Sequence, residues 1–155
     1  MIPLEIRPVQ QHELAAILNL YAELEIGDEP KSLDLPRAEK IWERIGHYQN
    51  YSVYVALTGR KIIGTFALLI MDNLAHQGAS SGVVEDVVVH PLWQGKGIGK
   101  QMMQFAIERC QQAGCYKLVL SSNLKRERAH QFYLDLGFQQ HGYSFLLTLP
   151  NTKEH

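Results

Sequence analysis

The sequence predicts a single α/β domain spanning residues 1–155, with a mixed, mostly antiparallel sheet of about six to seven strands and helices on both faces. The length of 155 residues is typical of one domain. Segments of β-branched or alternating apolar residues are interspersed with segments whose apolar residues recur every three or four positions. Strands and helices alternate in the second half of the chain but not in the first, so the sheet cannot be wholly parallel.

The first half of the chain combines helices with an expected hairpin. An edge strand is expected at residues 4–9, because Pro8 cannot donate a hydrogen bond to a neighbouring strand. Residues 51–57 and 61–71 flank the turn Thr58-Gly59-Arg60 and predict the hairpin. The apolar positions at helical spacing are Leu14, Ile17, Leu18, Tyr21 and Leu24 in one helix, and Ala38, Ile41, Trp42 and Ile45 in the next.

The second half contains the strongest strand signal. Residues 83–89 are β-branched and almost wholly apolar, which is typical of a central strand covered on both faces. A glycine-rich turn leads from there into a helix that begins near Ile98 and ends at Gly114. The remaining expected elements are a strand at 115–121, a helix at 129–136, and two terminal strands at 138–140 and 143–149.

Composition excludes several classes of protein. Lysine and arginine number 15 against 16 acidic residues, so a general electrostatic grip on nucleic acid or on an acidic membrane is not expected. The two cysteines have neither disulfide-framework nor zinc-site spacing, so no metal is expected and a reducing, cytoplasmic location fits. The chain shows no signal peptide, and no apolar run approaches the ~20 residues that a membrane span needs.

The turn at residues 94–100 has the composition of an anion-binding loop. Glycines allow close approach of a ligand to the backbone, and free N–H groups at a helix start favour a pyrophosphate. The dinucleotide-binding pattern fails because Lys100 stands where Gly or Ala is needed, and the P-loop pattern fails because Gln101 replaces Ser or Thr. The alternative interpretation is a helix start whose glycines serve only packing.

The pattern Gln94-x-x-Gly97-x-Gly99 resembles the acyl-CoA-binding motif of the GNAT superfamily of N-acetyltransferases. The preceding VVVHP segment is similar to the end of that family's central strand, and residues 129–138 resemble its "A…FY…GF" segment. The resemblance implies the GNAT fold and acetyl-CoA as the acetyl donor. The order of the expected elements agrees with the family over the whole chain.

The resemblance also implies where acetyl-CoA would bind. Its pyrophosphate would lie on backbone N–H groups of the turn, and its pantetheine arm would pair with the main chain of 87–89, where the central strand diverges from 115–121. The Asn123 amide would meet the cofactor, the alternative being a helix N-cap before Leu124. The implied cofactor-binding residues are Val87, Val88, Val89, Gln94, Gly95, Lys96, Gly97, Ile98, Gly99, Lys100, Asn123 and Tyr133.

Acetyl transfer to an amine needs a neutral amine, hydrogen-bond donors for the oxyanion and a proton for the departing thiolate. By the resemblance, Tyr133 would serve the thiolate; the alternative is a core aromatic. Glu85 is the expected base, and alternation along a strand places Asp86 on the opposite face, so only one of the two carboxylates should face the acceptor. The backbone N–H of Val88 is an expected oxyanion donor.

The loop that contains His76 resembles an Asn-Leu-Thr-His segment of some bacterial members, so His76 would contact the acceptor; the alternative is a solvated histidine. We therefore predict an N-acetyltransferase that moves acetyl from acetyl-CoA to a primary amine of a small molecule by direct attack. Residues 85–89 and 114–117 look like glucosamine-6-phosphate N-acetyltransferases, and 120–145 looks somewhat like aminoalkylphosphonate acetyltransferases.

Alternatives of other classes stay open. One is a non-catalytic acyl-CoA-binding or regulatory module, which would lack a usable acid or base. Another is a protein N-terminal acetyltransferase, and a third is a nucleotide-binding protein that uses the same turn. The expected partner is a small-molecule amine rather than nucleic acid or a membrane, and the terminal strands could pair across a homodimer.

Overall fold

The computed structural model describes residues 1–23 and 33–150. These residues belong to two compact units that divide between Val119 and Leu120, and each unit is described by itself. None of the helices in these two ranges combines the length and apolar character that a membrane crossing requires.

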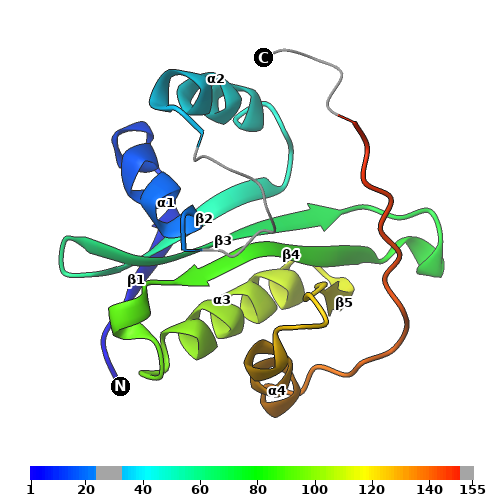
Figure 1. The fold of residues 1–155 in the computed structure, drawn as a ribbon. Coiled ribbons are helices and arrows are strands. Elements are labelled where there is room, and N and C mark those ends of the chain that lie inside the picture. The colour runs from blue at the N-terminus through cyan, green and yellow to red at the C-terminus, as the bar shows by residue number, and fades with distance from the viewer. Residues whose placement is uncertain (24–32, 151–155) are drawn as a thin grey trace. The chain divides into compact units, whose positions relative to one another are not determined.

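The first unit is built on a five-stranded sheet of order β1-β2-β3-β4-β5 (Figure 1). Neighbouring strands from β1 to β4 are antiparallel, whereas β4 and β5 are parallel, which confirms a mixed, mostly antiparallel sheet. The strands are β1 (Glu5–Pro8), β2 (Tyr51–Thr58), β3 (Lys61–Met71), β4 (Ser80–Val89) and β5 (Cys115–Val119).

Helices cover both faces of this sheet, as predicted (Figure 1). On one face, Ile17 of α1 (Leu14–Tyr21) packs against Val55 and Leu57 of β2. On the other, Phe105 of α3 (Ile98–Gln112) packs edge-on against the Tyr54 ring, with centroids 5.1 Å apart. Helix α2 (Leu35–Ile45) lies beside α1, and its N-cap Asp34 accepts a hydrogen bond from the Arg37 N–H. The face that carries α1 is called the α1 face below.

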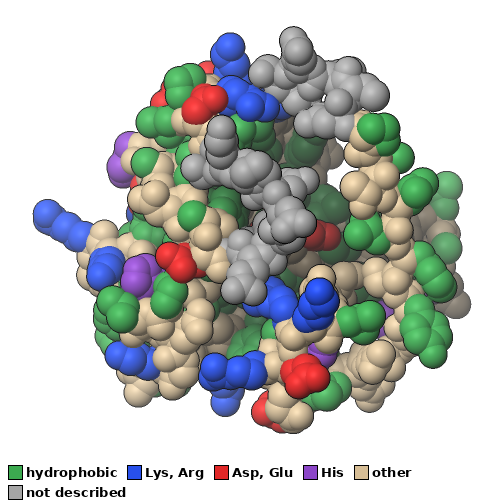
Figure 2. Space-filling view, in the orientation of Figure 1, with side chains coloured by type: hydrophobic (Ala, Val, Ile, Leu, Met, Phe, Trp, Pro, Cys, Tyr) green, Lys and Arg blue, Asp and Glu red, His purple; other side chains and the backbone are tan. Residues whose placement is uncertain are grey.

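The second unit differs from the sequence expectation. It contains α4 (Glu127–Asp135), but its described residues after α4 form no strand, so the predicted strands at 138–140 and 143–149 are wrong. Residues 1–23 and 33–150 together hold five strands rather than the expected six or seven. A strand needs a hydrogen-bonded partner as well as an alternating pattern. No described residue supplies one, and the side chains of Tyr143 and Phe145 are 87% and 92% exposed. Figure 2 shows hydrophobic side chains gathered along this segment.

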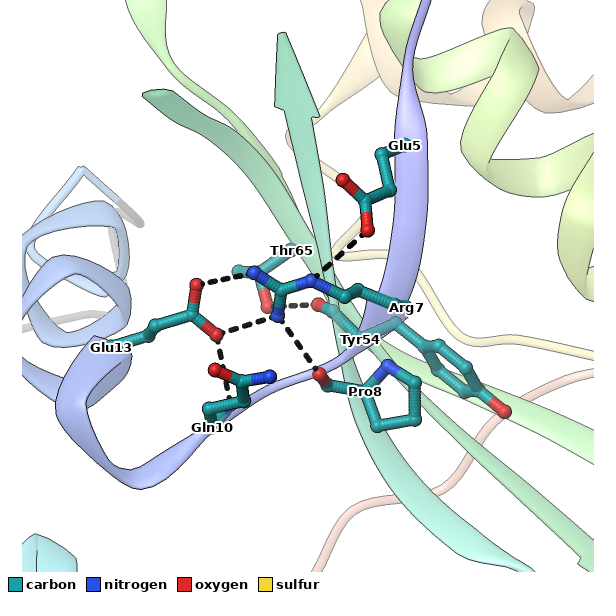
Figure 3. Close-up of polar contacts among 7 residues, drawn as sticks. All are labelled: Glu5, Arg7, Pro8, Gln10, Glu13, Tyr54 and Thr65. Carbon is teal, nitrogen blue, oxygen red and sulfur yellow. Dashed lines mark hydrogen bonds and ion pairs between the residues drawn. The ribbon is translucent and has the colours of Figure 1, made fainter. Parts of the chain in front are cut away.

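A partly buried ion pair ties β1 to the start of α1 (Figure 3). Arg7 donates from Nη1 and Nη2 to the two carboxylate oxygens of Glu13 at 2.7 and 2.8 Å, and the Gln10 N–H donates to Glu13 Oε1 at 2.9 Å. Glu13 is 7% exposed. The hydrogen bond from Arg7 lowers the pKa of Glu13 from its ordinary 4.5.

The Glu13 carboxylate therefore stabilises the folded state at neutral pH. Because its folded pKa lies below its unfolded pKa, this contribution is full above the unfolded value and is lost as pH falls through the folded one. We expect Glu13→Gln to lower the free energy of unfolding by about 1–3 kcal/mol at pH 7 and by much less at pH 3, measured by urea unfolding. The control is Glu5→Gln, whose exposed side chain lies 3.3 Å from the same guanidinium and should matter little. Equal losses in the two variants would contradict this role.

Candidate functional site

A β-bulge interrupts β4 at its centre. Glu85 pairs with Ala67 of β3, and Val88 pairs with Thr65, so β4 has one more residue than β3 between these two pairs. Asp86 has φ of 54°, which is unusual for a residue other than glycine. A bulge of this kind bends the strand and redirects its side chains.

The bulge places both carboxylates on the α1 face. Val53 and Val55 of β2 pair with Ala67 and Thr65, which in turn pair with Glu85 and Val88, so all of these side chains share that face. Asp86 lies there too, because its charge reaches Tyr21 of α1 and Tyr51 of β2 and contributes to raising the pKa of each. The expectation that Asp86 points to the opposite face is therefore wrong, since strict alternation fails at the bulge.

Four ionisable residues form what we call the Asp86 cluster: Tyr21, Tyr51, Glu85 and Asp86. Burial, and then the Asp86 charge, raises the pKa of Tyr21 to about 12. Burial and the charges of Asp86 and Glu85 raise the pKa of Tyr51. Partial burial raises the pKa of the Asp86 carboxyl, although much of that side chain stays exposed. An aspartate with a raised pKa is a stronger proton acceptor than an ordinary one.

Sequence reasoning misses the two tyrosines of this cluster. Tyr21 carries no signal beyond its place on the apolar face of a helix. Tyr51 does carry a usable signal, because alternation through 51, 53, 55 and 57 places its ring on the same face as Val53, Val55 and Leu57. What cannot be foreseen is that α1 crosses this face close to the bulge.

The edge of β4 that faces β5 is open along its second half. The parallel pairing of the two strands ends at Val83 with Val119, so no residue of β5 pairs with 84–89. This confirms the divergence expected between the central strand and the strand at 115–121. A strand edge of this kind offers unpaired N–H and C=O groups to an extended ligand.

The register decides which main-chain groups of β4 are available at this edge. His90 N–H donates to Ile63 O at 2.8 Å, and hydrogen-bonded pairs alternate along an antiparallel ladder, so Val88 bonds to Thr65 of β3. The expectation that the Val88 N–H is free for an oxyanion is therefore wrong. The main chains of Val87 and Val89 face the open edge instead, and Val89 O accepts a hydrogen bond of 3.1 Å from Gln94 Nε2.

The glycine turn lies directly after this edge. Gly95 and Gly97 have φ of 74° and 81°, a left-handed conformation that glycine adopts at little cost. The Gln101 N–H makes the first bond of α3, to Gly97 O at 3.1 Å, which leaves the N–H groups of 98–100 without helical partners. Free N–H groups at the positive end of a helix dipole bind phosphate oxygens. Lys96 Nζ lies 5.3 Å from the Trp93 ring centroid.

Two predicted site residues, Asn123 and Tyr133, belong to the second unit. Asn123 Oδ1 accepts from the Lys125 N–H at 2.9 Å, and α4 begins only at Glu127, so the alternative role of Asn123 as the helix N-cap is wrong. Tyr133 packs edge-on against Phe132 and Phe138, with ring centroids 5.1 and 5.7 Å away. Burial raises the pKa of Tyr133, which keeps its hydroxyl protonated at neutral pH.

His76 lies away from the Asp86 cluster. It belongs to the turn between β3 and β4, has φ of 54°, and stacks on Tyr116 of β5 with ring centroids 4.3 Å apart. This turn leads into Ser80, six residues before Asp86 on β4, a separation of about 20 Å along a strand. The structure therefore does not bring His76 to the two carboxylates. Residues 1–23 and 33–150 contain no group of three His, Cys, Asp or Glu side chains that could hold a metal ion.

Sequence and structure comparisons identify known proteins that are similar to this chain. A glucosamine 6-phosphate N-acetyltransferase of Trypanosoma brucei brucei is 30% identical over 149 residues, which cover 96% of this chain and 98% of that protein. An aminoalkylphosphonate N-acetyltransferase of Salmonella typhimurium is 34% identical over 100 residues, 64% of either chain. A solved structure described as a transcriptional regulator from Bacillus halodurans superposes with a TM-score of 0.88 at 25% identity, covering 95% of this chain and all of that one.

The profile described as the acetyltransferase (GNAT) family matches residues 14–138, which include the whole glycine turn and the segment 129–138 on which the resemblance depended. The match therefore confirms the family indicated by those two segments. The chain belongs to the GNAT family of acetyltransferases.

Proposed function

We propose that this protein transfers the acetyl group of acetyl-CoA to the primary amine of a small molecule, by direct attack of the amine on the thioester. The observation that carries the proposal is the bulge at Asp86, because this carboxylate of raised pKa belongs to the strand whose unpaired edge leads into the glycine turn. The full-length similarity to a glucosamine 6-phosphate N-acetyltransferase supports it.

Acetyl-CoA would bind along the open edge of β4. The main-chain groups of Val87 and Val89 suit the amides of the pantetheine arm, and the N–H groups of Ile98, Gly99 and Lys100 suit the pyrophosphate. Gln94 holds the turn against the end of β4 through its bond to Val89 O. Acetyl-CoA supplies an activated carbonyl carbon and a thiolate leaving group, so the proposed chemistry needs no metal.

In the proposed reaction, the bound ammonium group first loses one proton to solvent and becomes a neutral amine. Asp86 then takes the second proton, which the amine nitrogen loses as the C–N bond forms. The Val87 N–H, which faces the open edge, stabilises the oxyanion. When the C–S bond breaks, the Tyr133 hydroxyl gives its proton to the thiolate and regains one from solvent. Glu85, the base expected from the sequence, lies on the same face as Asp86, and we assign it the role of keeping the acceptor site negative so that a cationic amine is attracted.

The acceptor we propose is a small amine that also carries an anionic group. This follows from the two relatives, which are named for a sugar phosphate amine and for aminoalkylphosphonates. The test is a panel of glucosamine 6-phosphate, 2-aminoethylphosphonate and neutral amines, incubated with acetyl-CoA while free thiol is measured. The regulatory alternative is favoured by the similarity to the Bacillus halodurans protein, which is described as a transcriptional regulator. It predicts acetyl-CoA binding with no thiol release for any acceptor.

The role of Tyr133 can be tested separately from packing. We expect Tyr133→Phe to reduce turnover at least about tenfold while the KM for acetyl-CoA changes little, because the thiolate needs its proton only in the transition state. The ring contacts with Phe132 and Phe138 remain, so the free energy of unfolding should change by no more than about 1–2 kcal/mol. Turnover within a factor of about two of the parent would remove Tyr133 from the mechanism.

A further inference from the structure

The α1 face of the sheet has a covered part and an open part. Where Ile17 of α1 packs on the sheet, Val55, Thr65 and Ala67 are at most 1% exposed. Further along the same strands, the next side chains on this face are only partly buried. They are Tyr51 and Val53 of β2, Leu69 of β3 and Val83 of β4. The face therefore presents a partly exposed apolar surface beyond the part that α1 covers.

One row of this open part leads across the sheet toward a carboxylate. Tyr51 pairs with Leu69, and Leu69 pairs with Val83, so these three side chains are neighbours. Glu85 follows two residues after Val83 in unbroken register and therefore projects from the same face. Two strand spacings across and two residues along separate the Cα atoms of Tyr51 and Glu85 by about 12 Å. In agreement with this placement, burial and then the charges of Asp86 and Glu85 raise the pKa of Tyr51.

A second aromatic ring stands beside the Tyr51 ring. The centroids of the Tyr48 and Tyr51 rings are 6.1 Å apart, and the ring planes are inclined by 53°. The Tyr48 N–H donates to Ile45 O at 3.0 Å, and Asn50 O accepts from the Ile70 N–H at 2.8 Å, so the backbone is held on both sides of Tyr48. The residue is nonetheless 63% exposed, and it offers an aromatic surface to a ligand. Four residues form what we call the aromatic shelf: Tyr48, Tyr51, Leu69 and Val83.

We propose that the aromatic shelf holds the carbon skeleton of the acceptor and selects a cyclic amine, an amino sugar, over a short open-chain amine. The axial C–H groups of a glucosamine ring form flat apolar faces that pack against an aromatic ring, while the equatorial hydroxyl groups stay in water. A ring whose amine lies at the carboxylates of Glu85 and Asp86 extends over the shelf. The two-carbon chain of 2-aminoethylphosphonate is too short to cover it.

This inference rests on the proposed function but is tested apart from it. Calorimetric binding of glucosamine 6-phosphate and 2-aminoethylphosphonate to the CoA-loaded protein needs no turnover. Both ligands carry a primary amine and an anionic group, so they differ mainly in the skeleton between these two groups. We expect Tyr48→Ala to weaken binding of glucosamine 6-phosphate about tenfold and to leave binding of 2-aminoethylphosphonate unchanged. Because Tyr48 is largely exposed, the substitution should leave the fold intact, which circular dichroism checks.

Two control variants separate ring packing from other effects. Tyr48→Phe keeps the ring and loses only the hydroxyl, so it should bind glucosamine 6-phosphate like the parent. Tyr116→Ala removes a tyrosine ring that is 43% exposed but lies on the opposite face of the sheet. An ideal Cβ on Gly82 would approach both Leu118 of β5 and Cys110 of α3, which places Leu118, and Tyr116 two residues before it, on the α3 side. This variant should also bind both amines like the parent.

The outcomes separate this inference from the proposed function. If Tyr48→Ala weakens binding of the amino sugar alone while the parent releases no thiol, the proposed function fails and this inference stands. Equal weakening of both amines, unchanged binding of the amino sugar, or an equal loss in Tyr48→Phe would overturn the inference and leave the function intact. A parent that binds neither amine, or only 2-aminoethylphosphonate, would overturn it as well. In an active parent, Tyr48→Ala should lower kcat/KM for glucosamine 6-phosphate relative to 2-aminoethylphosphonate by about the same factor as the affinity.

Discussion

Replacing the Asp86 carboxylate with an amide in Asp86→Asn should reduce turnover by roughly 10²–10⁴-fold, the range typical of a lost general base. The substitution keeps the size of the side chain, and asparagine is among the residues that tolerate the positive φ of 54° at this position. The affinity for acetyl-CoA should stay the same, because the groups proposed to bind it lie at the open edge of β4 and in the glycine turn. Thiol release and calorimetry measure the two quantities.

The matched control is Glu85→Gln, which removes the neighbouring carboxylate from the same face. We expect it mainly to raise the KM of a cationic acceptor, because it lowers the negative charge of the site without removing the proton acceptor. If Glu85→Gln loses turnover and Asp86→Asn does not, Glu85 is the base and our assignment is reversed.

The pH dependence of the activity is a second test of the role of Asp86. A base must be deprotonated to act, so the parent should lose activity as pH falls through the raised pKa of Asp86. That acidic limb should lie above the ordinary aspartate value of ~3.9. In Asp86→Asn the limb should be absent, and activity should rise with pH as more of the amine becomes neutral.

Placing a side chain in the glycine turn should abolish acetyl-CoA binding. In Gly97→Val the new side chain stands at the start of α3, where the pyrophosphate is proposed to lie, and valine at φ of 81° also strains the loop. An ideal Cβ on Gly97 meets nothing within 4 Å, so the cost to the fold is conformational rather than steric. We expect no measurable heat of acetyl-CoA binding, with the circular dichroism spectrum retained.

Gly59→Val is the matched control for backbone strain. Gly59 has φ of 60° in the turn between β2 and β3, and its ideal Cβ also meets nothing within 4 Å. The variant should therefore be strained to a similar degree and should bind acetyl-CoA like the parent. Parent-like binding by Gly97→Val would remove the glycine turn from the cofactor site, and loss of binding in both variants would point to a general effect of strain.

Local patterns in the sequence were enough to predict most strands of the sheet. Residues 83–89 are β-branched on both faces, and the 51–71 segment carries its own turn, so β2, β3 and β4 could be predicted without knowledge of their neighbours. The segment 143–149 has an equally clear alternation but no strand partner among the described residues. A pattern shows that a segment can bury one face, whereas pairing depends on what lies beside it.

Only one part of the candidate site could be predicted from the sequence: the turn in which the residue type itself indicates the backbone conformation. The glycines of the turn predicted close approach of a ligand to the backbone, and the structure adds that Gly95 and Gly97 are left-handed. The positions of Glu85 and Asp86 could not be derived, because a bulge is defined by counting residues against the partner strand. Tyr21 could not be predicted for a similar reason, since its place in the Asp86 cluster depends on the packing of α1 over β4.

The extra residue in β4 also determines how this strand can change in evolution. Deletion of one residue between Glu85 and Val88 would restore an uninterrupted hydrogen-bond ladder with β3, and the amino-acid composition of the strand would hardly change. The same deletion would remove the left-handed backbone conformation at Asp86. The side chains of this part of β4 would then alternate regularly between the two faces of the sheet, so Glu85 and Asp86 could no longer share one face. The strand would gain regularity, yet the acceptor site would lose one of its two charges. A shortened β4 in a natural or engineered descendant is therefore a mark of lost transferase activity, even when every residue of the glycine turn is retained.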